Sequence, residues 1–169
     1  VRDKDRLNLA IRNVDIVYHA AAMKHIEICE DNPFDAVKTN VVGTSNILEA
    51  SIIEGVEKFV FISTDKATNP TSTLGGSKLL AERLTLAAGT YSGKGKTKFA
   101  IVRFGNVLGS RGSVFQIFQK QIRTKKPLTV TDRNMTRFIM SISDAASMIL
   151  NVTKILTDGE IYILKMPSV

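Results

Sequence analysis

The sequence predicts an α/β fold in which helices cover both faces of a parallel sheet. Short β-like segments alternate along the chain with segments whose apolar residues recur at helical spacing, which is the pattern of a parallel sheet. The run from Lys58 to Ser63 is also apolar at almost every position, as expected for a strand that is covered on both faces. Right-handed crossovers then place the helices on the two sides of the sheet.

The first half of the chain supplies a strand, a long helix and the apolar strand already described. Asp15–Tyr18 is a short β-like run. Asn32 before Pro33 predicts a helix start, because a capping residue precedes proline at the first helical position. Apolar residues then recur at helical spacing from Phe34 to Glu54, and Gly55 marks the end of this helix.

The second half of the chain continues the alternation with the same signals. Glycines between 89 and 95 predict a loop, and Ser143 is the expected N-cap of the last helix. In order, the expected elements are a helix at 74–88, a strand at 99–104, a helix at 114–123, a short strand at 128–131, a helix at 143–155 and a strand at 160–164.

Composition is that of one ordinary globular domain covering residues 1–169, with 44% hydrophobic and 23% charged residues. No apolar run approaches the roughly 20 residues that cross a bilayer, and the chain opens with the charged VRDKDR instead of a signal pattern. Cys29 is the single cysteine, which excludes an intrachain disulfide framework and fits a reducing, cytoplasmic compartment. Cysteine and histidine are too few and too scattered for zinc, so no metal is expected.

The net charge of +7 is compatible with nucleic acid or an acidic membrane as a partner. Basic residues are spread along the chain, with short groups only at 94–98 and 123–126, and no nucleic-acid motif accompanies them. We therefore expect no nucleic-acid partner. A solvated basic surface is the simplest interpretation, and a cleft that attracts the phosphates of a sugar nucleotide is the functional alternative.

A polar cluster, Ser63-Thr64-Asp65-Lys66, follows the central apolar strand. Ligands of open parallel sheets bind beyond the carboxyl ends of the strands. A hydroxyl, a carboxylate and an ammonium on consecutive residues there are typical of a proton-transfer site. Lys78 follows twelve residues after Lys66, on the next expected helix. The structural alternatives are that Asp65 caps a turn and that Lys78 is a solvated helix lysine.

Five runs occur in order along the chain: HAAAMKHIEICEDNP, KTNVVGTSNILEAS, FVFISTDKATNPTSTLGGSKLLAE, VRFGNVLGSRGSV and MTRFIMSISDAASMIL. Together they resemble the CapD-type nucleotide-sugar 4,6-dehydratases of polysaccharide biosynthesis, in the extended short-chain dehydrogenase/reductase superfamily. The resemblance implies a partial Rossmann-like, doubly wound parallel sheet with flanking helices. Residues 1–169 would be the middle-to-C-terminal portion of the NAD(P)-binding domain plus part of the substrate-binding region. The N-terminal G-x-x-G-x-x-G segment of the family and its C-terminal part have no counterpart in these residues.

The resemblance also implies an NAD-dependent reaction, with NADP as the alternative cofactor, on a UDP-N-acetylhexosamine. A hydride leaves C4, water is eliminated across C5 and C6, and the hydride returns to C6, which gives a 4-keto-6-deoxy sugar. In family terms Lys66 removes the C5 proton, Asp65 protonates the leaving C6 hydroxyl, and Thr64 binds the 4-hydroxyl. Lys78 would bind the nicotinamide ribose. Leu74 stands where the superfamily has Tyr, so the acceptor of the 4-hydroxyl proton stays open.

Further binding residues are implied by the same resemblance. Ala20, Ala21 and Ala22 would let the protein backbone approach the cofactor closely, although small residues also suit tight helix–sheet packing. The mid-helix Asn40 would bond to the backbone and order a water in the active site. For His25 alone a structural role is the alternative, and for Arg137 a surface ion pair. The cofactor set is Ala20, Ala21, Ala22, Lys24, Asn40, Ser63 and Lys78, and the substrate set is Lys24, His25, Asn106, Arg111 and Arg137.

Three functions are therefore compared. The first is the dehydratase, and the second is a truncated, non-catalytic domain of the same fold that binds a nucleotide sugar or a partner chain. The third, a basic module for nucleic acid, is weakest because it leaves the polar cluster unexplained. We expect a UDP-sugar substrate and no membrane segment in this chain. We also expect a homo-oligomer, because the first strand would be an apolar edge that recruits another strand.

Overall fold

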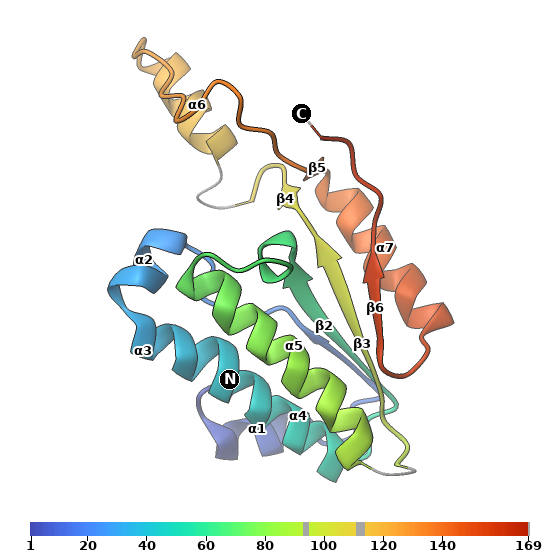
Figure 1. Cartoon of the computed structure of the whole chain (residues 1–169). Coiled ribbons are helices and arrows are strands. Elements are labelled where there is room, and N and C mark those ends of the chain that lie inside the picture. Colours follow the sequence, from blue (N-terminus) through green and yellow to red (C-terminus); the bar gives the residue numbers. More distant parts are fainter. Residues whose placement is uncertain (93–94, 111–113, 169) are drawn as a thin grey trace.

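The computed structural model describes residues 1–92, 95–110 and 114–168, and it contains a four-stranded parallel sheet (Figure 1). The strands stand in the order β1-β2-β3-β6, and their bounds are Ile16–His19, Lys58–Thr64, Lys98–Phe104 and Glu160–Ile163. Each neighbouring pair is parallel, with Phe61 of β2 opposite both His19 of β1 and Ile101 of β3. The parallel α/β prediction is confirmed.

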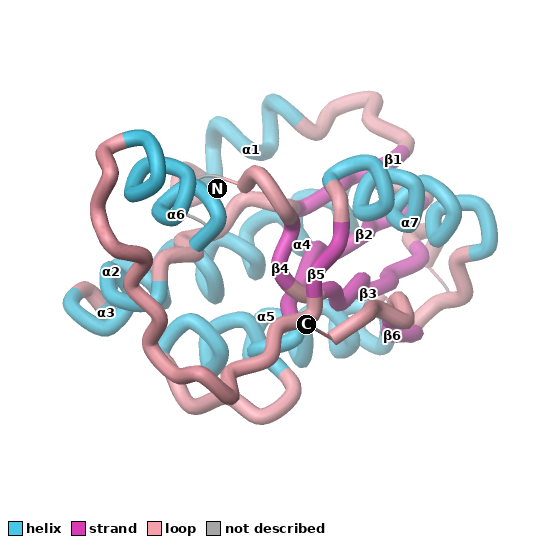
Figure 2. The backbone as a smooth tube through the Cα atoms, turned by 90° about the horizontal axis from the view of Figure 1, so that it is seen from above, coloured by secondary structure: helices cyan, strands magenta, loops and turns pink. Residues whose placement is uncertain are grey.

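Helices cover both faces of this sheet, which Figure 2 shows from above. α4 (Gly43–Ile53) and α5 (Thr73–Tyr91) cover one face, and α7 (Ile142–Ile155) covers the other. Alternate residues of a strand point to opposite faces, so Phe59 enters the core under α4 and α5 while Val60 enters the core under α7. This two-sided burial is the reason for the unbroken apolar character of β2.

The expected helix at 34–54 is three consecutive segments: α3 (Pro33–Ala36), a π-helical turn η1 (Val37–Val42) and α4. Pro33 takes the first helical position as expected. The side chain of Asn32 makes no capping bond and donates instead to the carbonyl oxygen of Ile28, at 3.1 Å. Two short helices that the sequence did not indicate precede α3, namely α1 (Lys4–Ala10) and α2 (Ile26–Asp31).

Helix α5 is longer at both ends than expected. It begins at Thr73, with the Ser72 hydroxyl accepting the N–H of Gly75 at 3.2 Å, and it runs through Gly89 to Tyr91. The expected loop at 89–95 was therefore wrong at its start, and its residues 93–94 lie outside the described part of the chain. Gly89 serves packing instead of a turn, since a Cβ there would lie 3.1 Å from the Asp158 carboxylate.

The C-terminal third departs from expectation in three places. Helix α6 (Val114–Arg123) has the predicted bounds, but α7 is capped by Ser141, which forms a capping box with Asp144, and not by Ser143. The expected strand at 128–131 is wrong, because those residues pair with no described strand. A second sheet that was not predicted joins β4 (Asn106–Val107) to β5 (Ile139–Met140). Among the described helices, none is long and apolar enough to span a bilayer.

Candidate active site

Strand β2 ends at Thr64, and a single 3-10 turn, η2 (Asp65–Ala67), follows at the carboxyl edge of the sheet. The Thr64 hydroxyl donates to Asp65 Oδ1 at 2.9 Å and accepts the N–H of Lys66 at 3.4 Å. Ala67 is fully buried and anchors the turn. The local sequence thus folds so that a carboxylate and an amine stand side by side beyond the strand end.

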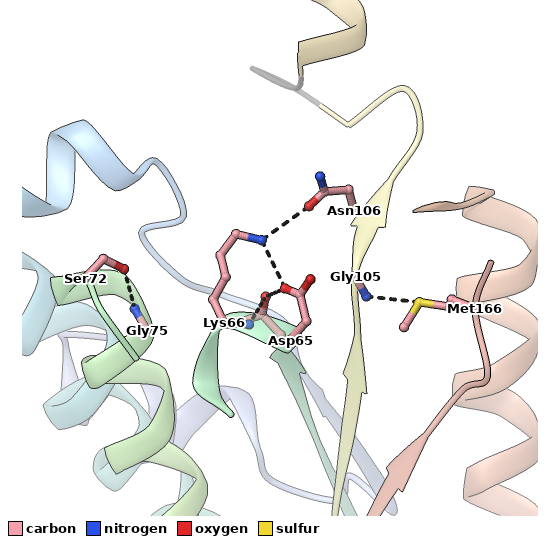
Figure 3. A network of polar contacts seen from close by, with 8 residues as sticks. Asp65, Lys66, Ser72, Gly75, Gly105, Asn106 and Met166 are labelled. Atoms are coloured by element: carbon pink, nitrogen blue, oxygen red, sulfur yellow. Dashed lines mark hydrogen bonds and ion pairs between the residues drawn. The ribbon is translucent and has the colours of Figure 1, made fainter. Parts of the chain in front are cut away.

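Figure 3 shows Lys66 lying between Asp65 and Asn106. Its Nζ is 3.0 Å from Asp65 Oδ1 and 3.3 Å from Asn106 Oδ1. Asn106 comes from β4, where its backbone N–H donates to the carbonyl oxygen of Phe138 at 2.8 Å. The side chains of Lys66 and Asp65 are 33% and 27% exposed, so the ion pair is partly buried and still open to a ligand.

Lys78 reaches the same region from α5 and is buried. Its Nζ donates to the carbonyl oxygen of Ile62 at 2.5 Å and lies 4.0 Å from the centroid of the Phe61 ring. Burial lowers the pKa of Lys78 to about 8, and the nearby Glu82 carboxylate acts in the opposite direction.

Sequence reasoning missed a buried network directly beneath this site. Glu82 accepts hydrogen bonds from the Ser63 hydroxyl and from Arg103, whose Nε lies 2.8 Å from Glu82 Oε1. The hydrogen bond to Glu82 raises the pKa of Arg103. Two signals could have found the pair: an arginine inside an otherwise apolar strand, and a glutamate one helical turn after Lys78.

A cleft of about 520 Å³ opens above these residues, between the strand ends and the β4–β5 segment. Its cations are Lys24, Lys66, Lys78 and Arg137, and none of the described residues that line it is a carboxylate. Such a lining favours an anionic ligand. A neighbouring cleft of about 260 Å³ lies on the other side of Asp65.

The structure brings most of the expected site residues to the larger cleft. Asp65 lines the neighbouring cleft, where it contacts Lys66. Ala21 and Asn40 are not among the lining residues. Arg111 lies outside the described residues. Those that line the larger cleft are Ala20, Ala22, Lys24, His25, Ser63, Thr64, Lys66, Lys78, Asn106 and Arg137.

Asn40 does not line the cleft but hydrogen-bonds to segments next to it. It lies in the π-helical turn η1 and is 1% exposed. Its Oδ1 accepts from the backbone N–H of Met23 at 2.8 Å, and its Nδ2 donates to the Met23 carbonyl and to the Ser77 hydroxyl, both at 3.0 Å. It therefore joins the loop that follows β1 to helix α5.

Leu74 lines the cleft from the first turn of α5, and it packs with Cys29 and Ala36 in a small core. Its side chain has no group that could exchange a proton. Leu74 therefore cannot serve as an acid or a base at this site.

The model of a family described as "Polysaccharide biosynthesis protein" matches residues 1–169. An uncharacterized membrane protein of Methanocaldococcus jannaschii is 58% identical over 169 residues, which are 100% of this chain and 51% of that protein. A UDP-N-acetylglucosamine 4,6-dehydratase (inverting) of Campylobacter jejuni is 46% identical over 99% of this chain and 51% of that protein. A UDP-glucose 4-epimerase of Rickettsia bellii is 40% identical over 99% of this chain and 49% of that protein.

Solved structures share the fold. Pen from Bacillus thuringiensis superposes with a TM-score of 0.96 at 47% identity, over 99% of this chain and 52% of that chain. DesIV, a dTDP-glucose 4,6-dehydratase from Streptomyces venezuelae solved with NAD and TYD bound, has a TM-score of 0.91 at 23% identity, over 99% of this chain and 57% of that chain. The second likeness shows the Rossmann-type fold alone. The chain spans about half the length of the curated relatives it matches.

Proposed function

This chain belongs to the polysaccharide biosynthesis protein family, and on that premise we propose that it carries the proton-transfer centre of an NAD-dependent nucleotide-sugar 4,6-dehydratase. The observation that carries the proposal is the Asp65–Lys66 pair, held at the edge of a cleft whose lining is cationic. The relative from Campylobacter jejuni, named as a UDP-N-acetylglucosamine 4,6-dehydratase, supports the choice of reaction and of substrate.

The residues present fit a nicotinamide cofactor. Ala20 and Ala22 line the cleft without bulky side chains, and Lys78 presents a buried ammonium that suits ribose hydroxyls. When bound, NAD supplies reversible hydride acceptance, which makes the C5 hydrogen of a 4-keto sugar acidic. The protein residues then need only to move protons at C5 and at the C6 oxygen.

The Asp65–Lys66 ion pair can enter the reactive state by one internal proton transfer. Moving a proton from Lys66 Nζ to Asp65 Oδ1, across 3.0 Å, gives a free amine and a carboxylic acid. The amine accepts the proton from C5, and the acid donates its proton to the C6 hydroxyl, which leaves as water while a double bond forms between C5 and C6. Lys66 then carries the C5 proton and Asp65 is a carboxylate, so the elimination restores the original ion pair.

The remaining cations suit the diphosphate of the substrate. Arg137 lines the cleft beside β5, and Lys24 lines it from the loop that follows β1. A guanidinium binds phosphate oxygens in a bidentate manner, and an ammonium adds a point charge. The expected substrate set also includes Arg111, which lies outside the described residues. Its other members, Lys24, His25, Asn106 and Arg137, would bind the UDP moiety near the proposed catalytic pair.

The test is incubation of the protein with NAD and UDP-N-acetylglucosamine, followed by mass spectrometry of the sugar nucleotide. We expect a product that has lost one water, and no such product with Lys66→Ala. The exposed Lys154, on the far helix α7, offers a matched control, because Lys154→Ala should leave turnover unchanged.

Two other outcomes would contradict the proposal. A product of unchanged mass with inverted C4 would identify an epimerase, as the relative from Rickettsia bellii is named. Binding of the sugar nucleotide without any product, at saturating NAD, would favour the non-catalytic binding domain.

A further inference from the structure

Two residues of α5 that lie one turn apart hold two successive residues of β2. Lys78 Nζ donates to the carbonyl oxygen of Ile62, and Glu82 accepts the hydroxyl of the next residue, Ser63. The reactive residues 64–66 follow directly. Helix α5 therefore fixes the end of β2 at the point where the chain turns into the site.

Glu82 is the most buried member of this arrangement, at 1% exposure. Arg103 approaches it from β3 through both Nε and Nη2, so one carboxylate joins β2, β3 and α5. Buried ion pairs add little net stability, because the cost of desolvating the two charges offsets their attraction. Stability alone is therefore a weak reason for a carboxylate at this position.

The environment of Lys78 gives a second reason. Desolvation disfavours a buried ammonium, and Glu82 supplies an opposite charge one helical turn away. The Lys78 charge in turn contributes to lowering the pKa of His19. Other titratable and charged groups near this pair come from several elements. His19 on β1 is affected by the Lys78 charge, and Arg103 on β3 pairs with Glu82. Lys66, with its partner Asp65, follows β2 and lines the same cleft as Lys78.

We propose that Glu82 is a positioning residue that keeps the buried Lys78 protonated and directed into the cleft at neutral pH. The role of Lys78 in binding the cofactor rests on the proposed function. The charge state of Lys78 does not, because it is measurable without substrate or cofactor. With Glu82 in place the Lys78 ammonium dominates at pH 7, and without it the neutral amine gains population.

The experiment is an NMR titration of Lys78 in protein labelled with ¹³C-lysine, with the signal assigned through Lys78→Met. Glu82→Gln keeps the side-chain shape and removes the charge, and we expect it to lower the Lys78 midpoint by about one to two pH units. Glu82→Asp should restore much of the shift, because it returns the charge. Ser63→Ala removes one hydrogen bond to Glu82 and keeps its charge, so the midpoint should not move.

Glu82→Gln also leaves Arg103 buried without its counter-ion, which destabilises the fold. The double variant Glu82→Gln/Arg103→Met removes both charges, and its midpoint should fall by less than in Glu82→Gln, because the Arg103 cation also disfavours the Lys78 ammonium. Where Glu82→Gln alone does not fold, the double variant carries the test. A midpoint that stays near the parent value in folded Glu82→Gln or in the double variant, or an equal shift in Ser63→Ala, would overturn the proposal. Absence of dehydration by the parent protein would contradict the proposed function without affecting this titration.

Discussion

At the scale of single residues, the two members of the ion pair should fail in the same way when either is removed. In the proposed reaction, Lys66→Ala removes the amine that would accept the C5 proton, and Asp65→Asn removes the acid that would protonate the C6 oxygen. Loss of a positioned acid or base costs about 10² to 10⁴ in rate, and we expect that loss in kcat for each variant. Because the residues act as one pair, the double variant should be little slower than either single variant.

The measurement is steady-state turnover, with circular dichroism to confirm that each variant is folded. Near-normal kcat in either single variant would contradict the assigned role. Additive losses in the double variant would show that the two residues act separately.

Lys78 should lower the free energy of unfolding at pH 7. Burial lowers its pKa from 10.5 to about 8, so the folded state disfavours the charged form at pH 7 by about 3 kcal/mol relative to the unfolded chain. Lys78→Met removes that penalty, and we expect it to raise the free energy of unfolding at pH 7 by about 1–3 kcal/mol while weakening NAD binding. Urea denaturation measures the first effect and calorimetry the second.

The sign of this effect can be checked against pH. A folded-state pKa below the unfolded value means that stability is gained as pH rises from 8 towards 10.5. The advantage of Lys78→Met should therefore shrink across that window. A variant that is less stable than the parent at pH 7 would show that the ammonium stabilises the fold.

At the scale of elements, one amide in the π-helical turn η1, that of Asn40, joins the loop that follows β1 to helix α5. Asn40→Asp removes the two N–H donors that reach the Met23 carbonyl and the Ser77 hydroxyl, and it faces that carbonyl with a carboxylate. Unpaired buried polar groups cost about 1–3 kcal/mol each, so we expect a loss of about 2–4 kcal/mol in thermal or urea unfolding. Asn46→Asp is the matched control, since Asn46 is only partly buried and donates to a single carbonyl, that of Val1. Equal losses in the two variants would show that the buried hydrogen bonds of Asn40 stabilise the fold no more than the partly buried one of Asn46.

Strand β1 lies at one edge of the described sheet, paired only with β2 among the described strands. Ile16 and Tyr18 are 37% and 43% exposed there, and an apolar edge strand recruits another strand. We expect this chain to self-associate with rising concentration in light scattering, and Ile16→Lys to weaken the association. Ile53→Lys, at an exposed isoleucine near the end of α4, should have no such effect. A parent chain that stays monomeric at every concentration would refute the expected homo-oligomer.

The elements that sequence could predict are those with a long, regular signal. The apolar run of β2 and the helical spacing of α7 predicted nearly correct bounds, because burial on one or two faces dictates these patterns. Helix α6 also has the predicted bounds, although none of its residues is buried. The two-residue strands β4 and β5 carry no periodicity and form only through contacts between distant segments. Residues 128–131, for which the strand prediction is wrong, are of strand-forming types. However, Val130 is 62% exposed, and the segment pairs with no strand among the described residues.

The candidate site was predictable where it lies in consecutive residues. Thr64, Asp65 and Lys66 end a strand, so their joint placement follows from the fold class. Glu82 and Arg103 belong to separate elements, and neither looks functional alone. Their pairing depends on how α5 packs against β3, which no local pattern specifies.

At the scale of the whole molecule, the segment that carries α6 stands away from the sheet (Figure 1). The cleft is lined both by this segment and by the strand ends. Helix α6 has no buried residue, yet Val114 and Phe115 in its first turn line the cleft. The opposite wall is the rigid sheet edge with Lys66 and Lys78. The proposed catalytic pair thus belongs to the well-packed body, while α6, which faces it across the cleft, is loosely packed.

The whole fold should also be sensitive to acid through one histidine. His19 on β1 is 2% exposed, and its Nε2 lies 2.9 Å from the Thr44 hydroxyl. Burial, with a smaller contribution from the charge of Lys78, lowers the pKa of His19 from 6.5 to about 4. The unfolded chain therefore binds a proton at a higher pH than the folded chain, and stability present above pH 6.5 is lost as pH falls towards 4.

We expect this loss to reach about 3 kcal/mol by pH 4, measured by urea denaturation at a series of pH values. His19→Phe keeps an aromatic ring beside Phe59 and Phe61 and removes the titration. The Thr44 hydroxyl stays paired in that variant, because it donates to the carbonyl oxygen of Asn40 at 2.6 Å. The variant should therefore lose less stability than the parent between pH 6.5 and 4, whereas the matched control His25→Phe, at an exposed position, should follow the parent curve. If the His19→Phe and parent curves run parallel through this window, the buried imidazole is not the origin of the acid sensitivity, and protonation of carboxylates must account for it.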